Sequence, residues 1–455
     1  MRNLRIIWIT VLVLSLFGLV NAQDGSDLEG RPEFPAPEFP AGLDWLNVPA
    51  PVTMQALRGK VVLLDFWTYG CINCIHMIPT LHRLEEKYGS ALAVIGVHSA
   101  KFLNEGQTDN LRQIVQRYGL EHPVVNDRDF AVWDTYAPYG VNAWPTFVVI
   151  DPRGNLYAVQ AGEIPFDAFD RLIGAMIEHF DGLGEINREP LAAQLERDAV
   201  PSSVLAFPGK VLADPVGNRL FIADSSHNRL VITDLLTYEV LDVIGSGTAG
   251  FTDGDFSTAT FDKPQGLTLR GDTLLVADTQ NHAIRAVDLL TRQVTTIAGT
   301  GVQGYERSQS GPALEMALAS PWDLWAAADG ILYIAMAGTH QIWTLSPDGI
   351  VGPLVGSGGE GLREGPFESA TLAQPSGLFL QDNVLYWADS ESSSIRAADL
   401  TARETRLVAG PLTGSLFDFG DVDGGLGTVR LQHPLAIIGA DDGLLYLADT
   451  YNSKI

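Results

Sequence analysis

The chain of 455 residues has little cysteine and little positive charge. Its two cysteines cannot build a zinc site of four thiolates, and the nearby His76 and His82 are not at a convincing ligand spacing. Lysine and arginine total 29 against 55 acidic residues, a net charge of −26. This balance argues against nucleic acid as a partner, because no basic patch is available to neutralise phosphates. The sequence also lacks a glycine-rich phosphate loop and a nucleophile elbow, so the cysteine pair is the strongest candidate for chemistry.

Both cysteines lie in one stretch, residues 61–88, in which a strand pattern changes to a helix pattern. An apolar run at its start predicts a buried strand. After a short turn, Cys71-Ile72-Asn73-Cys74 opens a segment whose apolar residues have the three-and-four spacing of a helix face: Met77, Ile78, Leu81, Leu84 and Tyr88. The first turn of a helix has unpaired N–H groups and a positive dipole end, so a thiolate at Cys71 is stabilised there and becomes the nucleophile. Cys74 lies on the same side of that turn and can resolve a mixed disulfide on Cys71.

These residues resemble the thioredoxin superfamily. Asp65 stands six positions before Cys71, where the family has a buried carboxylate that helps deprotonate the second cysteine. Trp67 matches the family's aromatic residue before the motif, and Pro79 follows Cys74 by five positions, where the family helix is kinked. The resemblance implies that Cys71 attacks, that Cys74 resolves and that Asp65 accepts a proton. It also implies a Cys71–Cys74 disulfide in the oxidised form.

A second part of the resemblance lies downstream. Trp144, Pro145 and Thr146 precede an apolar run and match the family's cis-proline loop, which packs beside the disulfide and presents backbone to a bound polypeptide. The resemblance therefore implies that these residues and Trp67 form a docking site for a client protein, with no cofactor and no metal. Two departures are present. The dipeptide between the cysteines is Ile-Asn rather than Gly-Pro, so no redox potential carries over, and the tryptophan before Pro145 is bulkier than usual.

Three other interpretations of the motif stay open. CxxC is half of some zinc sites, although the further ligands that such a site needs are not evident. An inert structural disulfide is the second alternative, but a CxxC between a strand and a helix is a redox context. A peroxiredoxin-like peroxidase is the third. Thr68 and Cys71 match part of that motif, while its upstream proline is replaced by Leu64.

Residues 1–22 resemble a secretory signal peptide, with two arginines before an apolar run and Ala22 at the end. An uncleaved anchor is the alternative, and either way we expect the rest of the chain to be exported, to the periplasm or the extracellular space. The segment does not end in cysteine, so it is not a lipoprotein signal. An oxidising compartment favours a lone cysteine pair as a working disulfide.

We expect a Pro-rich flexible lead over residues 23–42, a thioredoxin-like α/β domain over 43–182 and a charged linker over 183–204. The domain resembles the TlpA-like and AhpC/TSA-like branch of the superfamily. Its patterns predict a strand over 91–97, a helix over 109–118 capped by Asp109, a hairpin with strands over 147–150 and 156–160, and a closing helix over 166–180 that buries Phe169, Leu172, Ile173, Met176 and Phe180.

From residue 205 to 455, glycine and short strand-like runs replace helices, and one core pattern recurs five times. The equivalent positions of the cores are Asp224, Asp278, Met336, Asp389 and Asp449. Each core follows a proline-containing segment and resembles an NHL repeat, one blade of a β-propeller. We expect the repeated polar residues to fix turns and neighbouring strands rather than to perform chemistry. Since NHL propellers commonly have six blades and the chain stops inside the fifth core, we expect the propeller to continue beyond Ile455.

A thioredoxin-like domain followed by an NHL propeller resembles the group of NHL-repeat-containing thioredoxin-domain proteins. We therefore predict an α/β thioredoxin-like fold followed by an all-β propeller. The first hypothesis for function is an exported thiol–disulfide oxidoreductase whose propeller binds the client, with protein thiols and disulfides as partners and no stable membrane span after signal cleavage. The alternative is a propeller scaffold whose thioredoxin-like domain is structural. An acidic turn at residues 421–424 could bind calcium, although its spacing falls short of an EF-hand loop.

Overall fold

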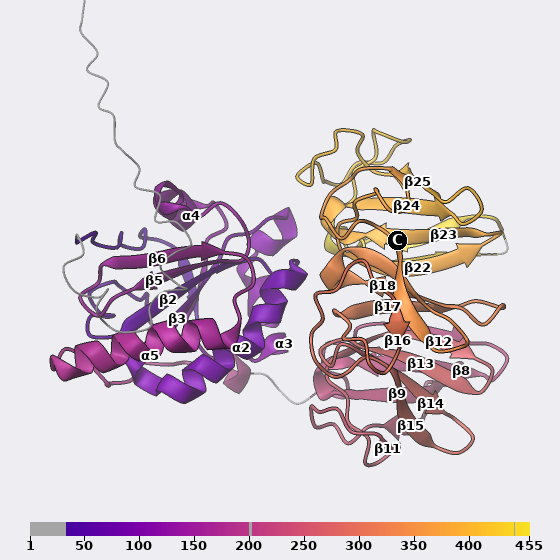
Figure 1. The fold of residues 1–455 in the computed structure, drawn as a ribbon, viewed down its shortest axis with the longest axis horizontal. Coiled ribbons are helices and arrows are strands. Elements are labelled where there is room, and N and C mark those ends of the chain that lie inside the picture. The colour runs from indigo at the N-terminus through magenta and orange to yellow at the C-terminus, as the bar shows by residue number, and fades with distance from the viewer. Residues whose placement is uncertain (1–32, 200–202, 441) are drawn as a thin grey trace, which may run out of the picture. The chain divides into compact units, whose positions relative to one another are not determined.

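The computed structural model describes residues 33–199, 203–440 and 442–455. The predicted signal peptide, residues 1–22, and the first part of the predicted lead, residues 23–32, lie outside the described residues. The described residues divide into two compact units, the first made of those up to 101 and from 105 to 199, and the second of 102–104 with those from 203 onward. Figure 1 shows helices and a sheet in the first unit and mainly sheets in the second, which confirms the predicted fold class. Among the described residues, no helix is both long and apolar enough to cross a membrane.

The first unit is built on one mixed sheet. Within residues 33–199 its strands lie in the order β1-β4-β3-β2-β5-β6 and are β1 (Asp44–Leu46), β2 (Val61–Trp67), β3 (Leu92–His98), β4 (Val124–Asn126), β5 (Thr146–Ile150) and β6 (Leu156–Ala161). Its α-helices are α2 (Ile72–Tyr88), α3 (Thr108–Tyr118), α4 (Ala131–Tyr136) and α5 (Phe166–Gly182). β2 and β3 are parallel, and every residue of both strands is buried. Burial on both faces explains why their sequences are nearly continuous apolar runs.

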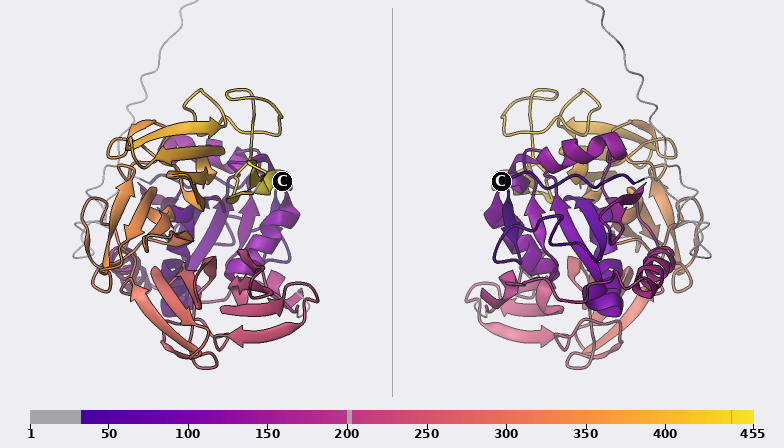
Figure 2. Two further views of the ribbon diagram at one scale, coloured as in Figure 1. Left: turned by 90° about the vertical axis from the view of Figure 1, so that its right-hand side faces the viewer. Right: turned by 90° about the vertical axis from the view of Figure 1, so that its left-hand side faces the viewer.

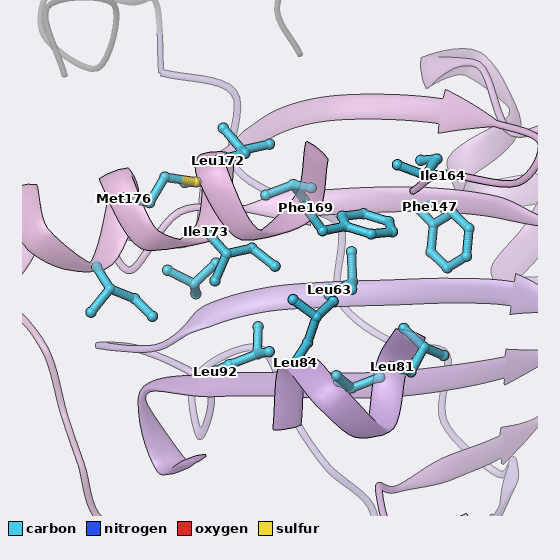
Figure 3. Packing of buried hydrophobic residues seen from close by; sticks show 14 of the residues in the cluster. Leu63, Leu81, Leu84, Leu92, Phe147, Ile164, Phe169, Leu172, Ile173 and Met176 are labelled. Carbon is cyan, nitrogen blue, oxygen red and sulfur yellow. The ribbon is translucent and has the colours of Figure 1, made fainter. Parts of the chain in front are cut away.

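Helices α2 and α5 bury their apolar faces against one face of this sheet. Figure 3 shows Leu63 of β2 among Leu84 of α2 and Phe169 and Ile173 of α5. The residues predicted to face inward from α5 are all buried, so the closing helix and its register are confirmed. Each fully buried side chain of this size stabilises the unit by about 2 kcal/mol. This core holds the strand that carries Asp65 and the helix that carries the cysteines in one rigid arrangement.

Two segments that were expected to be loosely attached pack against the first unit. In the predicted lead, Phe39 is buried and the Glu38 carboxylate accepts a hydrogen bond from the Met54 amide. In the predicted linker, the carbonyl oxygen of Asn187 accepts a hydrogen bond from the Lys60 ammonium at 3.0 Å. Parts of both segments are therefore packed structure. Composition did not reveal this, because one apolar side chain and a few backbone carbonyls find their partners through the tertiary fold.

The predicted cap of α3 is wrong by two positions. The helix begins at Thr108, with Gln107 at the cap position, so Asp109 lies inside the first turn and pairs with Arg112. A carboxylate in the first turn still stabilises the positive end of the helix. The predicted hairpin is confirmed by the antiparallel pairing of β5 with β6.

The second unit consists of antiparallel sheets that follow one another around a common centre in chain order, as Figure 2 shows. The strands that the structure describes from residue 203 onward are β7 (Val211–Asp214), β8 (Arg219–Asp224), β9 (Arg229–Asp234) and β10 (Val240–Ile244) in the first sheet; β11 (Gly254–Asp255), β12 (Pro264–Arg270), β13 (Thr273–Asp278), β14 (Ala283–Asp288) and β15 (Gln293–Ala298) in the second; β16 (Gly311–Pro312), β17 (Pro321–Ala326), β18 (Leu332–Met336), β19 (Gln341–Leu345) and β20 (Ile350–Val355) in the third; β21 (Gly365–Pro366), β22 (Pro375–Gln381), β23 (Val384–Asp389), β24 (Ser394–Asp399) and β25 (Glu404–Ala409) in the fourth; and β26 (Ala436–Gly439) and β27 (Leu445–Ala448) in the fifth. Each repeat core thus corresponds to one sheet, which is the predicted arrangement of propeller blades.

The repeated aspartates hold the blades together internally. Asp278, at the end of β13, accepts hydrogen bonds from the Arg285 guanidinium and from the Asp262 amide, each at 2.8 Å. In the fourth sheet, Asp389 binds Arg396 in the same way at 3.1 Å. All four charged side chains of these two pairs are fully buried. These contacts agree with the predicted structural role.

The third sheet replaces this ion pair by apolar side chains. Met336 stands at the aspartate position and Trp343 at the arginine position, and both are buried. The indole N–H of Trp343 donates to the Gln341 side-chain oxygen at 3.1 Å. The same two positions of a blade therefore hold either a buried ion pair or two apolar side chains.

The inner strands of the second unit meet around a buried ion pair. The Lys210 ammonium, next to β7, lies 2.7 Å from the Asp323 carboxylate of β17 and donates to the Ser376 carbonyl of β22. Burial lowers the pKa of Lys210, and the carboxylate of Asp323 opposes that shift. At Gly266 of β12, an added Cβ would lie 2.5 Å from the Asp323 Cα atom. The ion pair and the hydrogen bond thus join the first, third and fourth sheets. At the same point β12 of the second sheet approaches so closely that no side chain fits at Gly266.

Candidate functional site

The two cysteines lie at the start of α2, as predicted. Cys71 occupies the position before the helix, with extended backbone, and Cys74 lies in the first turn. Cys71 is partly exposed, whereas Cys74 is only 1% exposed, and both are free thiols in the structure. The predicted difference in burial is therefore confirmed, and Cys71 is the thiol that a partner can reach.

The Cys74 thiol lies in surroundings that disfavour its ionisation. Burial raises the pKa of Cys74, and the hydrogen bond with Cys71 and the charge of Asp65 raise it further. Cys74 therefore holds its proton near neutral pH and needs a base before it can act as a nucleophile. Such a thiol suits a resolving cysteine, which must not react before the first cysteine does.

Asp65 is placed to be that base. It lies near the end of β2, is 4% exposed, and its Oδ1 atom has no hydrogen-bond partner. Burial raises the pKa of Asp65 to about 7, and the positive charge of His122 lowers it in part. A carboxyl with this pKa can exchange protons at neutral pH. The roles assigned to Cys71, Cys74 and Asp65 remain predictions.

Glu105 is a site residue that sequence reasoning missed. Its buried carboxylate accepts hydrogen bonds from the Thr68 hydroxyl, from the Gly70 amide at 2.9 Å and from the Lys101 amide at 2.9 Å. The first two donors belong to the turn that leads into Cys71, so Glu105 holds the turn in place. An isolated glutamate more than thirty positions from the motif gives no sequence signal for this contact.

The cis-proline loop leads directly into β5, whose first residue is Thr146. The Trp144–Pro145 peptide bond is cis, as the resemblance implied. Thr146 pairs with Phe66 in the antiparallel register of β5 and β2. This pairing places Pro145 opposite the end of β2, from which the chain turns into the cysteine motif. The sheet therefore brings together two segments that are more than seventy residues apart.

The predicted docking residues differ in their exposure. Trp144 is partly exposed and packs against Trp133, with ring centroids 4.8 Å apart. Trp67 and Thr146 are 2% and 0% exposed, and Pro145 is buried as well. The side chains of Trp67 and Thr146 therefore lie beneath the surface of the site. The docking role of the four residues stays a prediction, in which the loop offers its backbone to a client.

The search for metal-binding groups concerns the described residues alone. Within them, no group of three or more His, Cys, Asp or Glu side chains is placed to hold a metal ion. In the acidic turn at residues 421–424, the Asp421 carboxylate pairs with the Lys454 ammonium at 2.5 Å.

Comparison with known proteins gives matches to each part of the chain. A family model described as thioredoxin-like matches residues 59–156. The thiol-disulfide oxidoreductase YkuV of Bacillus subtilis (strain 168) is 29% identical over 129 residues, which cover 28% of this chain and 84% of that protein. These matches cover the strands and the helix that carry the cysteine motif.

Two longer relatives match nearly the whole chain. Protein SUPPRESSOR OF QUENCHING 1, chloroplastic, of Arabidopsis thaliana is 44% identical over 433 residues, which cover 92% of this chain and 41% of that protein. NHL repeat-containing protein 2 of Bos taurus is 41% identical over 451 residues, which cover 92% of this chain and 61% of that protein. The chain thus spans less than two thirds of the length of either relative.

Proposed function

The chain fits an NHL-repeat thioredoxin-domain protein, and on this premise we propose that it is an exported thiol–disulfide oxidoreductase whose propeller binds the client protein. The observation that supports the activity best is the arrangement of the three reactive groups. A partly exposed Cys71 precedes the helix, Cys74 is buried one turn behind it, and the Asp65 carboxyl lies buried beneath with an unpaired oxygen. A relative of the first unit named as a thiol-disulfide oxidoreductase adds support.

In the reductive direction, the Cys71 thiolate attacks one sulfur of a client disulfide. A Cys71–client disulfide forms, and the other client sulfur leaves as a thiolate. Cys74 then gives its proton to Asp65 and attacks the Cys71 sulfur, so that the second client thiolate leaves and the Cys71–Cys74 disulfide forms. Two electrons pass from the cysteine pair to the client, and a reductant must restore the dithiol. The oxidative direction is the reverse of these steps.

Reduction of insulin by the purified chain tests the activity. With dithiothreitol as the terminal reductant, wild type should reduce the insulin disulfides well above the rate of dithiothreitol alone, because Cys71 supplies the nucleophile. The Cys71→Ser variant is the control and should give the background rate. Wild-type activity no higher than that of Cys71→Ser would leave the chain as a propeller scaffold with a structural first unit.

Export and client binding need experiments of their own. The basis for export is the signal-like sequence of residues 1–22. When the chain is produced in a Gram-negative host, it should collect in the periplasm without these residues, as intact mass will report. An unprocessed chain that stays in the cytoplasm would contradict export. The propeller proposal predicts that a client captured on Cys71 also contacts residues of the second unit in chemical cross-linking.

A further inference from the structure

The buried carboxyl of Asp65 needs a path for its proton. Asp65 lies on the face of β2 that points toward α2, because Leu63, two positions earlier on the strand, packs against that helix. Its Oδ1 atom is buried and unpaired. Each round of exchange leaves a proton on Asp65 that must reach water before the next round. The proton path is therefore part of the proposed activity, on which this inference rests.

Gly96 opens a space beside Asp65. The two residues are paired in the parallel register of β2 and β3. An added Cβ on Gly96 would lie 3.1 Å from the Trp67 indole nitrogen and 3.4 Å from the Nε2 atom of His122. The indole nitrogen is also buried and unpaired. Glycine thus lets the Trp67 N–H and the His122 imidazole approach the backbone beside Asp65. The charge of His122 acts on the Asp65 carboxyl from there.

His122 connects this point to the outside of the unit. Its ring is buried, and the Nδ1 atom lies 3.3 Å from the Glu85 carboxylate on the side opposite Nε2. The Glu85 side chain is 26% exposed and, with His122, Lys60 and Ser90, lines a cavity of about 300 Å³. The imidazole therefore separates the buried carboxyl from a carboxylate in contact with solvent.

We propose that His122 is a positioning residue that transfers the proton between Asp65 and Glu85. A proton released by Asp65 is accepted at Nε2, and the proton on Nδ1 leaves to the Glu85 carboxylate and then to water. The relay is balanced, since one proton enters the imidazole and one leaves it. The proton on Asp65 comes from Cys74. After it has reached water, the thiolate released from the client takes up a proton from the solvent.

The charges around the relay are suited to it. Burial opposes the charged form of His122, but the carboxylates of Glu85, Asp65 and Glu121 outweigh it and raise the pKa of this histidine. The pKa of Asp65 is about 7. Asp65 can therefore change protonation state near neutral pH, and the raised pKa of His122 favours its taking up a proton. Cys74 of α2 interacts with the charge of Asp65. Lys60 lines the same cavity as His122, and its ammonium is held by the carbonyl oxygens of Ser90, Asn187 and Glu189.

Release of thionitrobenzoate from Cys71 tests the relay. With a pKa of about 7, part of Asp65 is protonated at neutral pH and must lose its proton through the relay before it can accept the proton of Cys74. Reaction with the aromatic disulfide reagent loads Cys71 with this coloured thiol, and attack by Cys74 releases it. His122→Gln and Glu85→Gln should slow release at neutral pH, His122→Gln by roughly ten-fold or more. In both variants, the pH at which the rate of release rises should also differ from that of wild type. Glu86→Gln, at the next, exposed position of α2, is the matched control and should behave as wild type.

Rescue separates proton transfer from a structural role. Imidazole in the buffer should speed release by His122→Gln and leave wild type unchanged, because the cavity gives a small base access to the relay. Slow release that no buffer restores would show that His122 only holds the fold and would overturn the proposal. A His122→Gln rate equal to wild type would also overturn it. If wild type itself takes up no thionitrobenzoate on Cys71, the proposed oxidoreductase function fails as a whole, and with it the relay.

Discussion

At the scale of single residues, Asp65 and Cys74 are two titratable groups in one buried place. Burial raises the pKa of both, so each is neutral at a pH where its ordinary counterpart in water would be closer to ionising. Near neutral pH a fraction of Asp65 is ionised and can accept the proton of Cys74 directly, so this proton does not have to pass to bulk water first. Cys74 therefore keeps its proton until a base such as Asp65 takes it.

The Asp65→Asn variant measures how much the buried carboxyl costs the fold. The folded pKa is raised from 3.8 to about 7, so this residue's contribution to stability is complete below 3.8 and is lost as the pH rises through 7. Asparagine does not titrate, so only wild type loses this stability as the pH rises. The free energy of unfolding of the variant, relative to that of wild type, should therefore be higher at pH 8 than at pH 4 by about 4 kcal/mol. Hydrogen exchange of the β2 and β3 amides in the full chain reports this difference. A gain that is independent of pH would contradict the buried, protonated carboxyl.

At the scale of elements, the buried ion pairs of the blades set the register of neighbouring strands. Arg285 of β14 reaches Asp278 of β13 and also the carbonyl oxygen of Thr260, at 2.8 Å. Charged pairs this deep contribute little net stability over an apolar pair, but a single unpaired member is costly. The third sheet, with Met336 and Trp343 at the same positions, is an apolar version within the same chain.

A double-mutant cycle on this pair tests that view. Arg285→Trp alone should lower the free energy of unfolding by about 3–5 kcal/mol, because it leaves the buried Asp278 carboxylate without the charge that compensates it. Adding Asp278→Met should recover a large part of the loss, since the second sheet would then resemble the third. Urea unfolding, followed by hydrogen exchange in the second sheet, gives both values. Losses that simply add would show that the two side chains do not depend on each other.

The sequence predicted those elements whose apolar pattern is long and regular. The buried strand before the motif, α2, the β5–β6 hairpin and α5 followed from periodicity and turn residues, and the cis-proline loop followed from the resemblance. The packing of residues such as Phe39 of the lead and Asn187 of the linker did not, because isolated contacts hold them. Glu105 and His122 were missed because their partners in the site, a turn for Glu105 and a helix for His122, are distant in sequence. A lone acidic residue or histidine carries no pattern that marks such a contact.

At the scale of the whole molecule, the two units are stabilised in different ways. The first is organised by the apolar core between its sheet and the helices α2 and α5. The second has a separate apolar cluster between each pair of neighbouring blades, with the Lys210–Asp323 pair where the inner strands meet. Loss of one central contact should therefore affect several blades at once, while the first unit is unchanged.

Asp323→Ala tests the central pair. It removes the carboxylate that compensates the buried Lys210 ammonium and should destabilise the second unit by about 3–5 kcal/mol. Asp329→Ala, an exposed change shortly after the same strand, should cost less than about 1 kcal/mol. Hydrogen exchange should rise in the inner strands of the first, third and fourth sheets of the Asp323→Ala protein. Exchange that rises only in the third sheet would mean that the pair does not join the blades.

The most direct measurement of the proposed activity is the intact mass of cysteine variants after exposure to oxidised glutathione. In the Cys74→Ser protein, Cys71 should carry one stable glutathione adduct, because the resolving thiol is missing. The Cys71→Ser protein should remain unmodified, since Cys74 is buried. Wild type should show no adduct and should lose two hydrogens as Cys71 and Cys74 join. Equal labelling of the two variants, or a wild type that keeps the adduct, would contradict the assignment of Cys71 as the attacking thiol and Cys74 as the resolving one.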